Sequence, residues 1–322
     1  MQQRYGAQAL GPYTGRLSND GERLVLRDSQ ANVIDSVEYG AGFPWPLGGG
    51  DLDLSIGLVN AMLDNNIPGA WRASGASPGG GNGAWLDNPP PFIGAVEHLP
   101  AMPTAYDNVQ IRAQVADADG VASVRLLLQD VAPGNYIRLT DPAYSANWTA
   151  VPMQSIGPDL YAADVPAHMR VHRHLIRYRI EATDRGGRTV TAPYWEDPQP
   201  NFALYVYNGV PSWGGAITPG APGWKGVWQT YDFNQMRPMA VYQLLAVGSD
   251  VADAQHIPDS RQSGYTGNDY PWSGTLVYNG VVYDHIGFRA RGGLRRYATG
   301  KNNWKFNFRR GHRFQAYDDY GG

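Results

Sequence analysis

The sequence predicts a mainly β protein in which two β-sandwiches are followed by a smaller unit that mixes helix and strand. Glycine and proline are abundant, with 40 and 24 residues among 322. They separate many short runs in which apolar and polar residues alternate, a pattern typical of strands and turns. The proline-rich stretches at 89–91 and 198–200 mark two boundaries between such units. We therefore predict domains at residues 1–88, 89–205 and 206–322.

The composition excludes several classes of function. The chain has no cysteine, so disulfides, thiolate metal sites and cysteine nucleophiles are excluded. Its formal net charge of −3 argues against a general nucleic-acid binder, because such domains are usually basic. No apolar run approaches the ~18–20 residues of a membrane span. The first residues lack the apolar core of a signal peptide, so the composition fits either the cytoplasm or export.

The first unit contains two alternating runs, 22–27 and 32–39, that predict strands joined by a turn, and a third short strand at 51–56. This order resembles the second half of a lamin-tail domain, an immunoglobulin-like β-sandwich. The matching residues are Leu17–Glu22, Val33–Tyr39, Trp45-Pro46 and Trp71. We expect both tryptophans to pack in a small core; the alternative is a platform for carbohydrate or peptide.

The opening strands of that family would precede Gly11, where this chain has too few residues to form them. We therefore expect a partial domain, and a chain that is a fragment of a longer protein. The resemblance implies a module for spacing or adhesion in an exported bacterial protein.

The second unit has five predicted strands separated by turn sequences. They lie near residues 109–115, 123–129, 161–165, 175–183 and 189–192, and 204–207 is expected to close the sandwich. The pattern Asp-x-Asp-Gly at 117–120 resembles bacterial immunoglobulin-like and fibronectin-type modules. Asp117 and Asp119 form either a turn or part of a calcium site; because no third acid is near in sequence, we favour the turn.

Three histidines cluster at positions 168, 172 and 174. On a strand, His172 and His174 would share one face and could both ligate a metal. We favour the alternative, in which they end a strand at the rim of the sandwich.

The third unit is expected to contain a helix that starts after Asp232, a short buried strand at 241–246, and a hairpin. The hairpin strands, 274–278 and 281–283, flank Asn279-Gly280, the strongest short hairpin indication that a sequence offers.

A cationic window, residues 285–313, follows directly and holds nine Arg or Lys residues without an Asp or Glu. Since the whole chain sums to −3, everything outside the window sums to −12 (−3 minus 9). The nine residues are Arg289, Arg291, Arg295, Arg296, Lys301, Lys305, Arg309, Arg310 and Arg313. Lysine is otherwise almost absent, so Lys301 and Lys305 stand out.

Alternation within the window predicts two antiparallel strands. Their aromatic face would carry Phe288 together with Trp304, Phe306 and Phe308; the opposite face would carry Arg289, Arg291, Lys305 and Arg309. A glycine-flanked loop at 292–302 joins them. Such a loop with converging cations can form an anion cradle; the alternative is a solvated basic sheet face.

The window and its surroundings resemble the N-terminal part of a spore-coat-H-type (CotH) kinase domain. The matching segments are 238–244, 274–280, 282–292, 300–308 and, near the end, Phe314 and 319–321. The resemblance implies a kinase-like α+β N-lobe that binds ATP with Mg or Mn and an activity that phosphorylates protein Ser or Thr. Arg289, Arg291, Lys301 and Lys305 match the family's basic motifs and would lie near the nucleotide phosphates. The family often has Ser after the Arg-Gly pair, where this chain has Gly293.

The fold class is therefore two immunoglobulin-like β-sandwiches followed by an incomplete α+β kinase-like N-lobe. The family's catalytic and metal-binding acids would come after Gly322, so we expect ATP-dependent phosphorylation of a protein substrate from the exported full-length parent and no catalysis from this chain alone. One alternative is a non-enzymatic cell-surface or matrix protein whose basic hairpin binds an acidic partner or polysaccharide. Another is a degenerate kinase-like scaffold.

Overall fold

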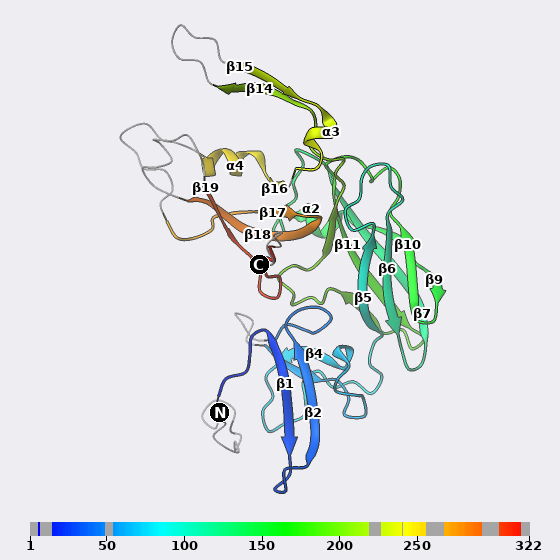
Figure 1. Ribbon diagram of the computed structural model, residues 1–322. Helices are drawn as coiled ribbons and strands as arrows, with labels where there is room; N and C mark the ends of the chain where they lie inside the picture. Colours follow the sequence, from blue (N-terminus) through cyan, green and yellow to red (C-terminus); the bar gives the residue numbers. More distant parts are fainter. Residues whose placement is uncertain are drawn as a thin grey trace.

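The computed structural model describes residue 6 and residues 15–48, 54–218, 227–239, 241–255, 267–291 and 303–316. The described part consists mostly of antiparallel strands gathered into several sheets (Figure 1). The prediction of a mainly β protein is confirmed. No helix among these residues is long and apolar enough to cross a membrane.

The first region, residues 15–88, contains two small antiparallel sheets. One pairs β1 (Gly21–Arg27) with β2 (Val33–Gly40), and the other pairs β3 (Leu54–Leu58) with β4 (Trp71–Gly75), which follows the 3-10 helix η2 (Pro68–Ala70). The rings of Trp45 and Trp71 lie 6.1 Å apart. Trp45 is buried and Trp71 is half-buried, with its Nε1 donating to the Asn65 carbonyl. Core packing of the two tryptophans is confirmed.

The second region, residues 89–205, is built from two sheets that share one core. The first sheet has the order β5-β6-β10-β9 and the second β12-β11-β7-β8, with β13 also on β11. Apolar side chains from both sheets meet between them, including Ile93 and Ile111 from the first and Leu126 and Ile180 from the second. The strand bounds are β5 (Phe92–Leu99), β6 (Gln110–Ala116), β7 (Val121–Val131), β8 (Thr149–Pro152), β9 (Gln154–Gly157), β10 (Leu160–Asp164), β11 (Leu175–Asp184), β12 (Thr189–Ala192) and β13 (Phe202–Tyr205).

The five strands predicted here are present, and β13 adds the expected edge beside β11. The sequence did not predict β5, β8, β9 or the short helix α2 (Pro142–Ala146). In β5 a bulge between Gly94 and Glu97, with Ala95 at φ 44°, interrupts the alternation. The strands β8 and β9 have only four residues each, too few for a periodicity to be recognised.

The histidine cluster is not on a strand. Strand β11 begins at Leu175, and His172 and His174 lie in the turns before it. His172 accepts a hydrogen bond from the Asn208 amide (3.1 Å), whereas His174 contacts Asp130 (2.8 Å). The two side chains thus have separate protein partners. The favoured prediction that they end a strand is wrong, because both lie in the connection that precedes β11.

The third region, which begins at residue 206, contains a four-stranded antiparallel sheet in the order β16-β17-β18-β19. The bounds are β16 (Tyr242–Ala246), β17 (Trp272–Tyr278), β18 (Val281–Arg291) and β19 (Asn303–Asn307). Asn279 and Gly280 both have positive φ, 48° and 78°, as a two-residue hairpin turn with matching twist requires. The predicted Asn-Gly hairpin is confirmed. Strand β16, which was predicted to be buried, is half-buried along most of its length.

The described residues of this region also form two helices and one further hairpin. Helix α3 (Phe233–Met236) starts directly after its N-cap residue, Asp232. The Asp232 side chain accepts a hydrogen bond from the Gln235 amide in a capping box, so the predicted helix start is confirmed. Helix α4 (Gly248–Gln255) follows β16. Strands β14 (Trp213–Thr218) and β15 (Val227–Tyr231) form a hairpin that projects away from the rest of the chain (Figure 1).

Candidate functional site

The cationic window forms the pair of strands that its alternation predicts. In the β18–β19 pairing, Phe288 lies opposite Phe306 and Arg289 lies opposite Lys305. Because side chains alternate between the two faces of a sheet, the aromatic residues share one face and Arg289, Arg291 and Lys305 share the other. We call these three residues the basic row. The predicted placement of these three residues is confirmed. Arg309, which was predicted to join them, follows the end of β19 and donates from Nε to the His285 carbonyl.

The three members of the basic row differ in exposure. Arg291 and Lys305 are exposed, whereas Arg289 is only 8% exposed. The guanidinium of Arg289 lies over the Tyr270 ring, 5.6 Å from its centroid, a distance at which a cation is attracted to an aromatic ring. A Cβ at Gly287, the neighbouring position on this face, would come within 2.8 Å of Tyr270 Cβ. Glycine therefore allows Tyr270 to lie close to the strand and cover Arg289.

Arg289 is one of five described residues with a buried side-chain polar atom that has no hydrogen-bond partner among the described residues. Its Nε is buried and has no hydrogen-bond partner among the described residues. A buried donor without an acceptor costs about 1–3 kcal/mol, so the position favours an acceptor supplied from outside the described part of the chain. An anion on the basic row would supply one.

The remaining cations of the window separate into two groups. Arg295, Arg296 and Lys301 fall in 292–302, outside the described residues, so the proposed contribution of Lys301 stays a prediction. Arg309, Arg310 and Arg313 follow the end of β19 and line a pocket that includes none of the basic row. The six cations of the window that the structure describes therefore do not all belong to one site.

Strand β18 is anchored by a buried ion pair that the sequence did not indicate. Asp284 and Arg177 of β11 have fully buried side chains. The guanidinium donates from Nε to Asp284 Oδ2 (2.7 Å) and from Nη2 to Oδ1 (3.1 Å). Asn201 donates to Oδ2 (2.9 Å), and Thr275 donates to Oδ1 (2.5 Å). The third-region sheet is thus joined to the second region through one completely hydrogen-bonded carboxylate.

A bulge in β18 explains how Asp284 reaches that partner. The register shifts between Gly274 and Leu276 of β17, so Asp284 and His285 together lie opposite Thr275. His285 has a φ of 54°, in the left-handed region that extra residues of bulges can adopt. Simple alternation would place Asp284 and His285 on opposite faces. With the bulge, both contact Asn201 of the second region.

The electrostatics of this pair follow from its burial. Burial alone would raise the pKa of Asp284, but attraction by His285 and Arg177, together with hydrogen bonds from Arg177 and Thr275, holds the pKa well below its usual range. Burial lowers the pKa of His285 to about 4, and the nearby cations Arg177, Arg309 and Arg179 lower it while Asp284 opposes them. At neutral pH the network therefore contains a carboxylate, a guanidinium and an uncharged imidazole.

The structure also corrects one prediction about acids. The sequence shows no third acid near Asp117 and Asp119, but Asp184 at the end of β11 brings a carboxylate within 4.8 Å of both. Burial, with Asp119 beside it, raises the pKa of Asp117 to about 6. Asp117 Oδ1 accepts from the amides of Asp119 and Gly120, so the favoured turn is confirmed. Counted at one ligand oxygen each, the three carboxylates supply three of the ~6–8 oxygens that calcium takes.

Comparison of the sequence with protein-family models and with curated proteins gives no match.

Proposed function

We propose that the basic row is the phosphate-binding part of an ATP site in a CotH-type, kinase-like lobe. The observation that carries this proposal is the cross-strand pair of Arg289 and Lys305, together with the buried Arg289 Nε that has no partner among the described residues. Guanidinium groups suit phosphate because their donors bind its oxygens in pairs, and a lysine adds a point charge.

The proposed ligand set is Arg289, Arg291, Lys301 and Lys305. The first two come from β18 and Lys305 from β19, and Lys301 belongs to the glycine-flanked loop between these strands. ATP with Mg or Mn, when bound, supplies the phosphoryl group that a kinase transfers to a protein Ser or Thr. Arg289 and Lys305 would hold its phosphates, and no residue of this chain is proposed as catalytic.

The proposed domain organisation accompanies this function. A partial lamin-tail-like sandwich at 1–88 and an immunoglobulin-like sandwich at 89–205 would space or attach an exported kinase whose lobe begins at 206. Strand pairing supports these limits, because every strand pair of the described residues lies within one of the three ranges.

Binding of MgATP to the chain tests the proposal, with a fluorescent ATP analogue as the titrant. Each charge-assisted hydrogen bond is worth about 1.5–3 kcal/mol, so Lys305→Gln and Arg291→Gln are each expected to weaken binding about tenfold or more. Arg125→Gln is the matched control: it removes an exposed arginine whose partner is Glu181, on the second region. Absence of MgATP binding, or equal affinity in all three variants, contradicts the proposal.

The second candidate is a surface that binds an acidic partner or polysaccharide, and the exposure of Arg291 and Lys305 favours it. It predicts binding that weakens steeply with salt, because exposed charges are screened. A polyanion without a nucleotide, such as heparin, would then displace the ATP analogue as well as ATP does. Displacement by ATP but not by an equal charge concentration of heparin separates the two functions.

A further inference from the structure

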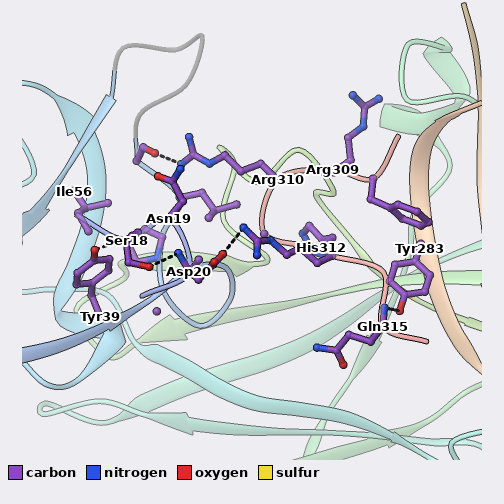
Figure 2. Close-up of a pocket in the computed structure, with 18 of the residues that line it drawn as sticks. Ser18, Asn19, Asp20, Tyr39, Ile56, Tyr283, Arg309, Arg310, His312 and Gln315 are labelled. Carbon is purple, nitrogen blue, oxygen red and sulfur yellow. Dashed lines mark hydrogen bonds and ion pairs between the residues drawn. The ribbon is translucent and has the colours of Figure 1, made fainter. Parts of the chain in front are cut away.

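A pocket of about 1020 Å³ lies beside the C-terminal end of the described chain (Figure 2). One wall comes from the first region, including Tyr39, Leu47 and Ile56, and the other from Tyr283 of β18 and the segment 308–315. Single-ligand pockets usually measure about 300–1,000 Å³, so this one is large enough for more than a small metabolite. Nothing in the proposed ATP site uses these residues.

The wall formed by residues 308–315 is held in place at several points. His312 contacts Asp197 of the second region at 2.7 Å. Phe308 and Phe314 stack with ring centroids 5.2 Å apart, and both pack against Tyr283. Gly311, at φ 80°, lies so close to Leu47 that an added Cβ would sit 3.0 Å from its Cδ1. The pocket is therefore formed by packed structure on both sides.

The charge lining the pocket is predominantly positive. Arg309, Arg310 and Arg313 face a single lining carboxylate, Asp20. Figure 2 shows Arg310 reaching toward the first region. Arg313 forms an ion pair with Asp20. Arg309 is occupied, because its Nε donates to the His285 carbonyl. Arg310 and Arg313 are thus the cations that remain most accessible.

These two arginines keep unused donors. Arg310 donates to the Gly48 carbonyl, and Arg313 pairs with Asp20. The Arg313 side chain is 69% exposed. A guanidinium has five N–H donors in a planar fork that matches a carboxylate. Arg310 can therefore bind a carboxylate beside its contact with the Gly48 carbonyl, whereas Arg313 must share its donors between a ligand and Asp20.

Part of the pocket lining is apolar: it includes Leu47, Leu54, Ile56 and Phe308, together with Tyr39. A ligand that satisfies both features needs carboxylates for Arg310 and Arg313 and aliphatic groups for these apolar side chains. An extended peptide provides both, because alternate side chains point to opposite sides and a short stretch spans the groove.

We propose that this pocket binds a short peptide segment that carries Glu or Asp among aliphatic residues. Arg310 and Arg313 bind the carboxylates, and the side chains of Leu47 and Ile56 contact the aliphatic groups. Asp20 competes with the ligand for Arg313. The site is independent of the proposed ATP site, since the basic row shares no residue with it.

The test uses fluorescein-labelled peptides of about eight residues, roughly 26 Å when extended. One alternates Glu with Leu, and its matched control alternates Gln with Leu. Fluorescence anisotropy is expected to show binding of the first peptide, with the control about tenfold weaker or more, as the loss of one charge-assisted contact predicts. The double variant Arg310→Gln, Arg313→Gln is expected to reduce affinity for the Glu peptide to that of the Gln peptide.

Two single substitutions test whether the charge of the pocket itself determines the affinity. Asp20→Asn removes the competing carboxylate from an exposed position, so it is expected to strengthen binding of the Glu peptide several-fold while leaving the fold unchanged. Arg125→Gln, which removes a similarly exposed charge on the second region, is expected to leave the affinity unchanged.

Three results overturn the proposal: equal affinity for the two peptides, unchanged affinity in the double variant, or weaker binding in Asp20→Asn. Displacement of the peptide by MgATP would show that the two ligands share one site, which contradicts the independence of the pocket and also overturns the proposal. Failure of MgATP binding alone affects only the proposed ATP site.

Discussion

Charged side chains in the middle of strand β18 are paired with opposite charges, whereas those at its end lie beside charges of the same sign. In its middle, Asp284 is fully buried and faces Arg177, so the charges cancel and the carboxylate accepts several hydrogen bonds. At its end, Arg289 and Arg291 stand beside Lys305, so the charges have one sign. Only Arg289 of these three is buried, and its Nε has no partner among the described residues.

The difference separates a structural use of charge from one suited to ligand binding. A buried pair with every donor and acceptor satisfied is costly to break, because removal of one partner leaves the other desolvated. Like charges at a sheet end repel each other and gain from an external anion. The same strand can therefore hold the third region against the second and present cations at its end.

The largest expected effect comes from breaking the buried pair. Asp284→Ala leaves the Arg177 guanidinium buried without its carboxylate, and we expect it to cost about 3–5 kcal/mol of the free energy of unfolding. Urea unfolding at pH 7, followed by tryptophan fluorescence, measures the loss. A cost below about 1 kcal/mol, the range of exposed pairs, would contradict the structural role assigned to the middle of β18.

Acidification is expected to weaken the same network through His285. Its pKa in the folded protein is about 4, below the value of about 6.5 in an unfolded chain, so the unfolded state takes up the proton first. Stability therefore falls as the pH drops from about 6.5 to about 4, and the pKa difference of roughly 2.5 corresponds to about 3 kcal/mol.

The variant His285→Gln keeps a donor for Asn201 and removes the titrating group. The free energy of unfolding, measured in urea across this pH range, should then fall by about 3 kcal/mol less than in the parent chain. Identical pH profiles for the two proteins would mean that His285 is not held uncharged by the fold.

A second, more exposed pair between the same two regions gives a smaller effect. Arg138 binds Asp250 of α4 at 2.7 Å, with side-chain exposures of 33% and 13%. Solvent screens this pair, so Asp250→Ala is expected to cost about 0.5–1 kcal/mol. The comparison with Asp284→Ala uses the same substitution in the same urea assay. Equal costs would show that burial is not what makes the Asp284 pair important.

Sequence alternation predicted the outer end of β18 better than its middle. Phe288, Phe306, Arg289 and Lys305 lie where a period of two places them, and the Asn-Gly turn set the start of the strand. These features depend on neighbours in sequence or on a single strand pairing. The aromatic face also formed as expected, with Phe306 and Phe308 half-buried against Tyr283 and Ile286.

The buried network was not predictable in this way. Arg177 lies 107 residues before Asp284, and the bulge at His285 reverses the face that alternation assigns to Asp284. Asp184 likewise joins Asp117 only because β11 returns beside the turn. An acid and a histidine inside the apolar run 281–288 were the only local indication that the strand had polar partners elsewhere.

The smallest expected effect is on the basic row. Arg291 and Lys305 are exposed, and substitutions of exposed residues without structural partners usually change stability by less than about 0.5 kcal/mol. The double variant Arg291→Gln, Lys305→Gln should therefore unfold at the parent's urea midpoint, or slightly above it because like charges are removed. A loss above about 1.5 kcal/mol would mean that these cations stabilise the fold. In that case the middle and the end of β18 would use charge for the same purpose, and the basic row would lose its distinction as a place for an external anion.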